Sequence, residues 1–505
     1  MEISGAFALG MKGNNVSDTR RLVDKLWSYA GVLRDAGVGV LEYTEQLTYL
    51  LFLKMAHERA HRPLKPEQIV PEEYSWQRLL DTEGVALETR YTLILQGLGR
   101  QPGMLGTIFR KAQNRVQDPA ILRRLIHDLI NKETWSGGGD LNGDAYESLL
   151  SKGASDKGSG AGQYFTPRPV ISAIVDVVRP TVEDTVVDPA CGTGGFLLGA
   201  HEYASQDAAR MNPEQRQHLK ASFVHGVEIV DGTARLAAMN LLLHGMGDAK
   251  GKSLIEVKDA LIDDPGKRWS VVLANPPFGT KSSITMVGTD GREAREDREI
   301  ERHDFVVTTS NKQLNFLQHI MTILDINGRA AVVLPDSVLF EGGVGEALRR
   351  RLLDDFDLHT ILRLPTGVFY AQGVKANVLF FDKKPASETP WTNRTWVYDL
   401  RTNQRFTPKK NPLTRGHLDE FVQSAKPGQP REESERFRSF TYDQLIARDK
   451  VNLDIIWLRD ESLEDLDHLP APDVIAREIV EDLTAALEEF AAVADALEPK
   501  ETSEA

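Results

Sequence analysis

The four residues Asn275, Pro276, Pro277 and Phe278, here called the NPPF turn, follow the apolar run WSVVLA at 269–274. This run predicts a buried strand that delivers Asn275 to the carboxyl edge of a sheet, where two prolines end the ladder. The Asn275 amide oxygen and the Pro276 carbonyl can both accept from an exocyclic NH₂ group. These two hydrogen bonds would localise the lone pair of the amino nitrogen, which is otherwise a poor nucleophile because the lone pair is delocalised into the ring. Phe278 offers a ring on which a flipped base can stack. The turn therefore predicts methylation of an amino group such as that of adenine, without a general base; a rigid turn with an apolar plug is the alternative.

A glycine-rich turn, DPACGTGGF at 188–196, lies where the apolar strand 185–188 ends and a helix begins. Gly192, Gly194 and Gly195 permit tight turns and close approach of a ligand to the backbone. Asp188 can accept from a ligand's ammonium group, directly or through water. Open α/β sheets bind ligands at this edge. The Asp-Pro-Ala sequence differs from the usual dinucleotide fingerprint, so we expect another adenosine-containing cofactor; a purely structural turn is the alternative.

Two further acidic residues follow the next strands. Glu228 ends FVHGVEI (223–229), where a carboxylate can accept from both hydroxyls of a ribose. Asp259, in IEVKDAL, can accept from an adenine amino group at the following strand end. Solvated strand ends are the alternative for both residues.

These side chains require a scaffold of alternating strands and helices. Short apolar runs predict strands at 185–188, 223–229, 269–274, 329–335, 359–365 and 377–383. Helices fit between them at 194–205, 231–246, 311–325 and 345–356. This order predicts an α/β fold with a doubly wound, mainly parallel sheet.

The remaining sequence predicts additional parts around this scaffold. Residues 17–135 have helical periodicity, beginning with Leu22 to Leu33, and glycine-rich segments place a domain boundary near 140–160. The highly charged stretch 279–310 predicts a mobile surface loop. After residue 385 the sequence is irregular, and a final helix with an apolar stripe is expected over 475–497.

Composition indicates a cytoplasmic globular protein. The 505 residues include no apolar run long enough for a membrane span and no N-terminal secretory signal pattern. The single cysteine, Cys191, excludes an intramolecular disulfide, and no Cys/His cluster has metal-ligand spacing.

The net charge of −14 is concentrated in the C-terminal tail. Residues 459–505 contain 15 acidic and three basic side chains, a charge of −12, which leaves −2 on the preceding 458 residues. A nearly neutral body cannot grip a DNA duplex strongly alone. We therefore expect a partner to supply much of the phosphate contact.

Taken in this order, the motifs resemble those of amino-methylating DNA methyltransferases, and more narrowly the modification subunit of type I restriction-modification systems. The resemblance runs through residues 17–460 and also includes AAMNLLLHGM (237–246), LPTGVFYAQGVKANVLFF (364–381) and VNLDI (451–455). The segment GQYFTPRPV (162–170) resembles the additional cofactor motif, and its position before the glycine turn corresponds to the gamma-type arrangement.

The resemblance implies S-adenosylmethionine as the cofactor and a Rossmann-like catalytic domain. Its cofactor-binding residues would be Gln163, Tyr164, Phe165, Thr166, Pro167, Arg168, Asp188, Ala190, Gly192, Thr193, Gly194, Gly195, Glu228 and Asp259. Segment 364–381 would contribute to the target-base side of the site. No clear Gly-Asp pair surrounds Asp259, and this departs from the family pattern.

The resemblance also implies three domains and several partners. They are a helical N-terminal domain (1–150), a catalytic domain (151–400) and a C-terminal extension (401–505) with an acidic helix for subunit docking. The partners would be DNA, a specificity subunit with two methyltransferase subunits bound to it, and a restriction subunit, with no membrane. A protein glutamine methyltransferase and a scaffold that has lost its chemistry are the competing hypotheses. The length of the chain, Phe278 and the intact NPPF turn count against them.

Overall fold

The computed structural model describes most of the chain between residues 40 and 459. The described ranges are 40–63, 66–135, 166–278, 283–287, 293–297, 299–369, 375–404, 406–407 and 411–459. The described residues up to Ile456 belong to one compact unit. The periodicity at Leu22–Leu33, the boundary at 140–160 and the helix at 475–497 lie outside the described residues.

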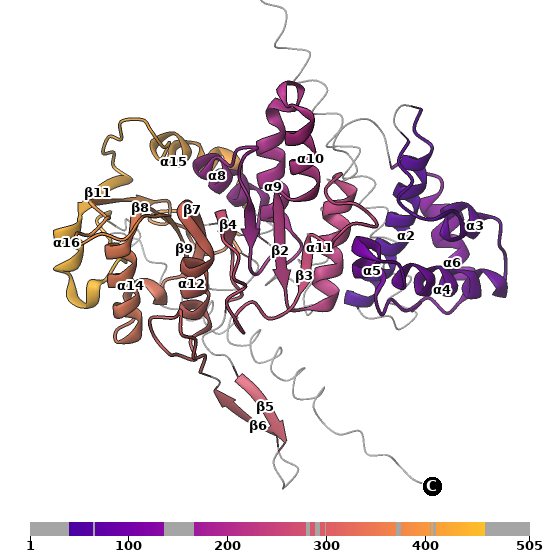
Figure 1. Ribbon diagram of the computed structural model, residues 1–505, viewed down its shortest axis with the longest axis horizontal. Helices are drawn as coiled ribbons and strands as arrows, with labels where there is room; N and C mark the ends of the chain where they lie inside the picture. Colours follow the sequence, from indigo (N-terminus) through magenta and orange to yellow (C-terminus); the bar gives the residue numbers. More distant parts are fainter. Residues whose placement is uncertain are drawn as a thin grey trace, which may run out of the picture. The chain divides into compact units, whose positions relative to one another are not determined.

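The first described region, residues 40–135, is helical as predicted (Figure 1). Helix α2 (Val40–Ala60) is buried at every position from Leu47 to Leu53, because a helix that is apolar around its circumference must be enclosed. The surrounding elements are η1 (Glu72–Tyr74), α3 (Trp76–Leu80), α4 (Val85–Gly99), α5 (Gly103–Phe109), α6 (Pro119–Arg123) and the π-helical η2 (Arg124–Ile130).

The second region is built on a nine-stranded sheet in the order β11-β10-β8-β9-β7-β4-β1-β2-β3. Pairing is parallel from β7 to β3 and between β10 and β8, whereas β9 and β11 run antiparallel to their neighbours. The strands predicted from apolar runs are present as β1 (Val186–Asp188), β2 (Val224–Glu228), β4 (Trp269–Ala274), β7 (Leu324–Pro335), β8 (Phe356–Arg363) and β9 (Ala376–Lys383). The predicted α/β class is therefore confirmed.

Helices connect and cover these strands, and the four that were predicted lie close to their expected bounds. The helices are α8 (Arg168–Val178), α9 (Gly195–Ala204), η4 (Ser205–Arg210), α10 (Pro213–Ala221), α11 (Asp231–Leu243), α12 (Lys312–Ile323), α13 (Ser337–Phe340) and α14 (Val344–Asp355). Helix α8 packs on α9, and α12 packs on α14. None of the described helices is long and apolar enough to cross a membrane.

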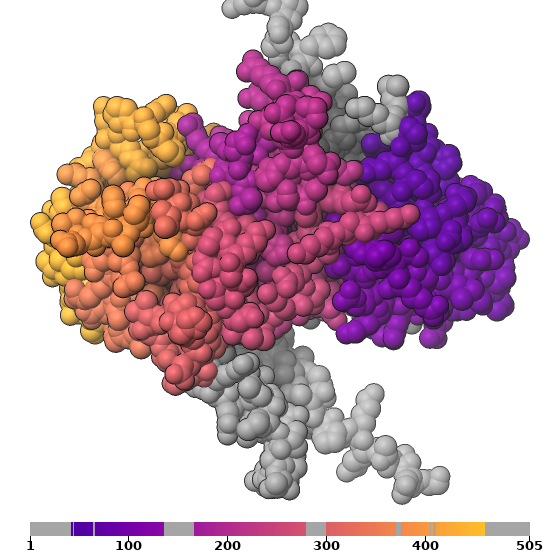
Figure 2. Space-filling model, in the orientation of Figure 1, coloured from indigo at the N-terminus to yellow at the C-terminus, as the bar shows by residue number. Residues whose placement is uncertain are grey.

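The expectation that the chain is irregular after residue 385 was wrong. This part contributes β10 (Arg394–Asp399), η5 (Arg415–Leu418), α15 (Asp419–Ser424), β11 (Phe437–Thr441), α16 (Tyr442–Ile446) and η6 (Asp449–Val451). Strands β10 and β11 mix polar with apolar residues, which hides them from a search for apolar runs. Strand β11 is the edge strand, and β10 lies between it and β8. In Figure 2, the yellow residues near the end of the described chain adjoin the orange residues that precede them, without a visible gap.

The described parts of segment 279–310 include regular secondary structure and buried side chains. They contain a hairpin of β5 (Ser283–Val287) and β6 (Glu293–Asp297), which pair antiparallel apart from the main sheet. Beyond the hairpin, the exposed residues Glu301 and His303 flank Arg302, whose side chain is only 4% exposed. Charged residues misled the prediction here because Arg302 and its neighbours pair with one another inside the fold.

The N-terminal helices dock on α11. Arg59 of α2 donates to the Leu242 carbonyl at 3.1 Å and also to the Leu243 carbonyl, near the end of α11. Arg235 of α11 pairs with Glu45 and donates to the Tyr49 hydroxyl at 2.8 Å. Helix α11 is therefore held by polar contacts on the side of the N-terminal region.

Candidate active site

A cavity of about 440 Å³ lies beyond the carboxyl ends of β1, β2, β3 (Ile255–Val257) and β4. The short strand β3 was expected before Asp259 but was given no bounds, because Glu256 interrupts its apolar residues. Many predicted site residues line this one cavity: Thr166, Asp188, Ala190, Gly192, Thr193, Gly195, Glu228, Asp259, Asn275, Pro277 and Phe278. Residues from 166 to 278 thus meet at the sheet edge where ligands bind in open α/β folds.

Other predicted residues lie next to the cavity or outside the described chain. Gly194, Pro167, Arg168 and Pro276 do not line the cavity. Pro167 precedes α8, and Arg168 pairs with Glu202 of α9 at 2.9 Å. Gln163, Tyr164 and Phe165 lie outside the described residues.

The glycine turn is shaped by two left-handed backbone positions. Gly192 has φ 54° and Gly194 has φ 84°, a region that favours glycine. Gly194 caps α9, so the first turn of this helix begins at the cavity. From the other side, Asn240 of α11 donates to the Thr193 carbonyl at 3.1 Å. The turn is therefore held between α9 and α11.

The two carboxylates at the ends of β1 and β2 are buried. Glu228 accepts from the Gly192 amide at 3.1 Å and the Val230 amide at 2.8 Å, so it ties the glycine turn to its own strand. Asp188 accepts from the Ala190 amide at 3.0 Å. Burial raises the pKa of both groups, that of Asp188 to about 8, with the nearby Glu228 acting in the same direction. Two carboxyl groups in a buried site favour a ligand that brings hydroxyl donors or a positive charge.

Asp259 follows β3 at the edge of the cavity. Its carboxylate accepts from the Leu261 amide at 2.9 Å, which shapes a turn there. The exposed side chain of Ile229 and the neighbouring Val230 line the same wall from the end of β2. This part of the cavity therefore combines an acceptor with apolar surface, as an adenine ring requires.

Strand β4 ends at the NPPF turn as predicted. The Asn275 side-chain amide donates to the Thr166 hydroxyl at 3.0 Å. Its oxygen Oδ1 is buried and has no hydrogen-bond partner among the described residues. An unpaired buried acceptor costs about 1–3 kcal/mol, so this atom points to a donor that a ligand would supply.

The rest of the turn packs against aromatic and amide side chains. The Phe278 ring meets that of Phe369 edge-on, with centroids 5.5 Å apart. Phe369 belongs to segment 364–381, whose residues 370–374 lie outside the described chain. The Pro277 carbonyl accepts from the Gln313 side-chain amide. This contact leaves the Pro276 carbonyl as the predicted second acceptor for a target amino group.

Several cavity residues were not found from the sequence. Lys312 and Phe316 come from α12, and Ile300 precedes that helix. Phe196 lies in α9, which follows β1, and Lys258 directly follows β3. The only signal for Lys312 and Phe316 was their spacing of four along a predicted helix, which places them on one face. Within the described residues, no cluster of His, Cys, Asp or Glu could hold a metal ion.

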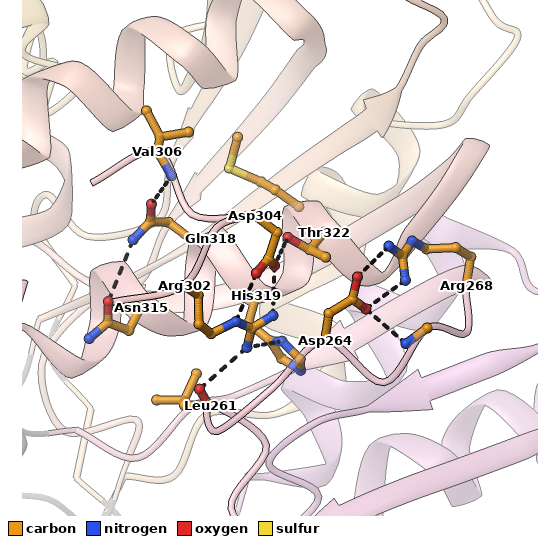
Figure 3. Close-up of polar contacts among 12 residues, drawn as sticks. Leu261, Asp264, Arg268, Arg302, Asp304, Val306, Asn315, Gln318, His319 and Thr322 are labelled. Atoms are coloured by element: carbon orange, nitrogen blue, oxygen red, sulfur yellow. Dashed lines mark hydrogen bonds and ion pairs between the residues drawn. The ribbon is translucent and has the colours of Figure 1, made fainter. Parts of the chain in front are cut away.

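A buried polar network fastens the segment before α12 to the cavity wall (Figure 3). Arg302 pairs with Asp304 at 2.6 Å and reaches the Leu261 carbonyl at 3.4 Å and His319 at 3.2 Å. Asp304 also accepts from the Thr322 hydroxyl at 2.7 Å. Burial, together with the Arg302 charge, lowers the pKa of His319 to about 3, so this imidazole is neutral. The network joins α12 to the residues that follow Asp259.

Comparison with protein families and relatives assigns both regions. Residues 137–458 match the N-6 DNA Methylase family, and residues 22–129 match the HsdM N-terminal domain. The chain is 38% identical to the methylase subunits of the type I restriction enzymes StySPI of Salmonella potsdam and EcoKI of Escherichia coli (strain K12). Each of these matches covers 94% of this chain and 94% of the relative.

Solved structures of similar proteins have the same fold. The crystal structure of the EcoKI M protein is 34% identical, with a TM-score of 0.52 over 96% of this chain and 98% of the other. A modification subunit of a putative type I restriction enzyme from Vibrio vulnificus YJ016 is 26% identical, with a TM-score of 0.66 over 85% and 93%.

Proposed function

Because the chain belongs to the family of type I restriction enzyme methylase subunits, we propose that it methylates the N6 amino group of a flipped adenine in DNA. The observation that carries this proposal is the buried Oδ1 of Asn275, an acceptor without a partner among the described residues. It lies beside Phe278 on the cavity that also contains the glycine turn. An amino group entering there would meet an acceptor and an aromatic ring together.

The cofactor is S-adenosylmethionine, which supplies a methyl group activated on a positively charged sulfur. The cavity has the size of a small-molecule site. Glu228 would accept from the ribose, Asp259 from the adenine amino group, and Asp188 from the ammonium end. Ala190, Gly192, Thr193, Gly194 and Gly195 would form the turn around the ligand, and Gln163, Tyr164, Phe165, Thr166, Pro167 and Arg168 would cover it as the additional motif.

The target adenine is held by the NPPF turn. Asn275 Oδ1 and the Pro276 carbonyl accept from its NH₂ group, which localises the lone pair on nitrogen. Phe278, supported by Phe369, stacks on the base. The product loses its proton to solvent, so no side chain has to act as a general base.

Other subunits bring this chain to its sites. DNA sequence would be read by a specificity subunit that binds two copies of this chain, and a restriction subunit would complete the cytoplasmic complex. The acidic segment 459–505 is unsuited to bind DNA directly, because its charge is −12. Its apolar stripe is the proposed docking surface, so deletion of residues 470–505 should release the specificity subunit. Unchanged co-purification of the shortened chain would exclude that role.

The central test is Asn275→Ala in the chain purified together with its co-purifying subunits. Transfer of a labelled methyl group to adenine in unmodified host DNA should be lost, while cofactor affinity changes by less than about threefold. Asn212→Ala is the matched control, because Asn212 caps the exposed start of α10 away from the cavity. Full activity of Asn275→Ala would exclude this mechanism. Label on protein glutamine instead of DNA would favour the competing methyltransferase class.

A further inference from the structure

Helix α12 makes a contact with the NPPF turn that the sequence motif does not include. Gln313 is only 1% exposed, and its Nε2 donates to the Pro277 carbonyl. Its Oε1 is buried without a partner among the described residues. Rotating the side-chain amide by half a turn would place Oε1 against the Pro277 carbonyl oxygen, and two acceptors repel each other. The need for a donor at this position therefore fixes the orientation of the Gln313 amide. The buried glutamine is thus arranged around one hydrogen bond to the turn.

The held carbonyl belongs to the peptide that joins Pro277 to Phe278. Pro276 and Pro277 have no N–H groups, so the backbone cannot tie the turn through donors at these positions. A donor from another element has to hold it. Because this peptide sets the direction in which Phe278 leaves the turn, the Gln313 contact also sets the contact between Phe278 and Phe369, whose centroids are 5.5 Å apart.

Gln313 is itself held in place by the start of α12. The Asn311 side chain accepts from the backbone N–H of Gln313 at 3.0 Å and from the backbone N–H of Leu314 at 3.3 Å, and this caps the helix. The neighbouring Lys312 lines the cavity, whereas Gln313 is turned toward the NPPF turn. The helix start therefore contributes to both the cavity and the support of the turn.

On the basis of the proposed function, we propose that Gln313 is a positioning residue for adenine methylation. It touches neither the cofactor site nor the reacting atoms. It holds the Pro277–Phe278 peptide so that Phe278 is placed to stack the target base while Asn275 accepts from its amino group. Loss of this donor should therefore lower kcat and leave cofactor affinity unchanged.

Gln313→Glu tests the role of the donor with almost no change in shape. A protonated glutamic acid can still donate to the Pro277 carbonyl, whereas an ionised one repels it. Lys312 and Lys258 on the adjoining cavity favour ionisation, and Asp188, Glu228 and Asp259 oppose it, so activity is compared with the wild-type complex at each pH. We expect kcat at least about tenfold below wild type at about pH 8.5, with partial recovery at about pH 6.

Gln318→Glu is the matched control on the same helix. Gln318 is 2% exposed, donates to the Val307 carbonyl at 3.0 Å and accepts from the Val306 amide at 2.7 Å (Figure 3). It makes these contacts with the segment before α12 and none of them with the NPPF turn. Its kcat, normalised to folded protein, should show no pH-dependent deficit relative to wild type.

The outcomes separate this inference from the proposed function. If Gln313→Glu keeps kcat within about twofold of wild type at both pH values, the positioning role is wrong. An equal pH-dependent deficit in Gln318→Glu would also overturn it. If Gln313→Glu does not fold, Gln313→Met removes the donor without adding charge and must lower kcat at unchanged cofactor affinity. Full activity of Asn275→Ala would instead overturn the proposed function itself.

Discussion

The side-chain amide of Asn275 donates to the hydroxyl of Thr166 at 3.0 Å, across 109 residues of sequence. This contact decides which end of the Asn275 amide is engaged within the protein. With Nδ2 engaged by Thr166, Oδ1 is the atom left to accept from a target amino group. Thr166, predicted only as part of the additional cofactor motif, therefore also supports the residue proposed to bind the target base.

Thr166→Val should lower kcat for DNA methylation by about five- to tenfold, because one hydrogen bond that orients Asn275 is lost. Thr166→Ser keeps the hydroxyl and should remain close to wild type. Steady-state kinetics of both variants, with cofactor affinity measured separately, checks this prediction. Equal activity of the valine and serine variants would show that the contact does not orient Asn275.

Gly194→Val should weaken cofactor binding more than Gly194→Asn does. A Cβ added here would meet only ordinary contacts, with the Ala237 Cβ at 3.7 Å. The cause is the φ of 84°, which asparagine tolerates better than a β-branched residue. Isothermal titration with S-adenosylmethionine measures the difference. Gly232→Ala on α11 is the control, because an added Cβ there has open space. Valine and asparagine variants of equal affinity would contradict the prediction.

Asp188→Asn should stabilise the cofactor-free protein increasingly as pH rises. The pKa of Asp188 is raised from 3.8 to about 8 by burial, so the folded state retains a proton that the unfolded chain has lost. Its contribution to stability is complete below about pH 4 and is lost as pH rises through about 8. The variant lacks this loss and keeps the oxygen that accepts from Ala190. Its Tm advantage over wild type should therefore grow between these pH values; a constant difference in Tm would exclude ionisation of Asp188 as the cause.

Arg302→Met should lower the free energy of unfolding by about 3 kcal/mol, because Asp304 would remain as a poorly solvated charge without its partner. Arg350 on α14 is the control, since it pairs with Glu346 but is 45% exposed. Arg350→Ala should change stability by no more than about 1 kcal/mol. Denaturant titration of both variants checks the comparison. Similar losses in both would show that the Arg302 network is not a structural anchor.

Much of the fold could be predicted because its signals are local. The apolar runs that became β1, β2, β4, β7, β8 and β9 are buried on both faces, so their composition alone identified them. Strands β10 and β11 escaped, since polar residues interrupt their apolar ones. The segment around Arg302 was misjudged because charge predicts exposure unless the partners are known, and Asp304 and His319 meet Arg302 only in the folded chain.

The sequence by itself determined the chemical groups of the site, because the NPPF and glycine turns each consist of consecutive residues that follow a recognisable strand. It also determined the family, since those turns occur in a characteristic order. Only the tertiary structure decided which end of the Asn275 amide and which proline carbonyl are already engaged. Those properties depend on Thr166 and Gln313, which reach the NPPF turn from other elements through contacts of single atoms. No local pattern in the sequence encodes such contacts, because they arise when distant segments pack together.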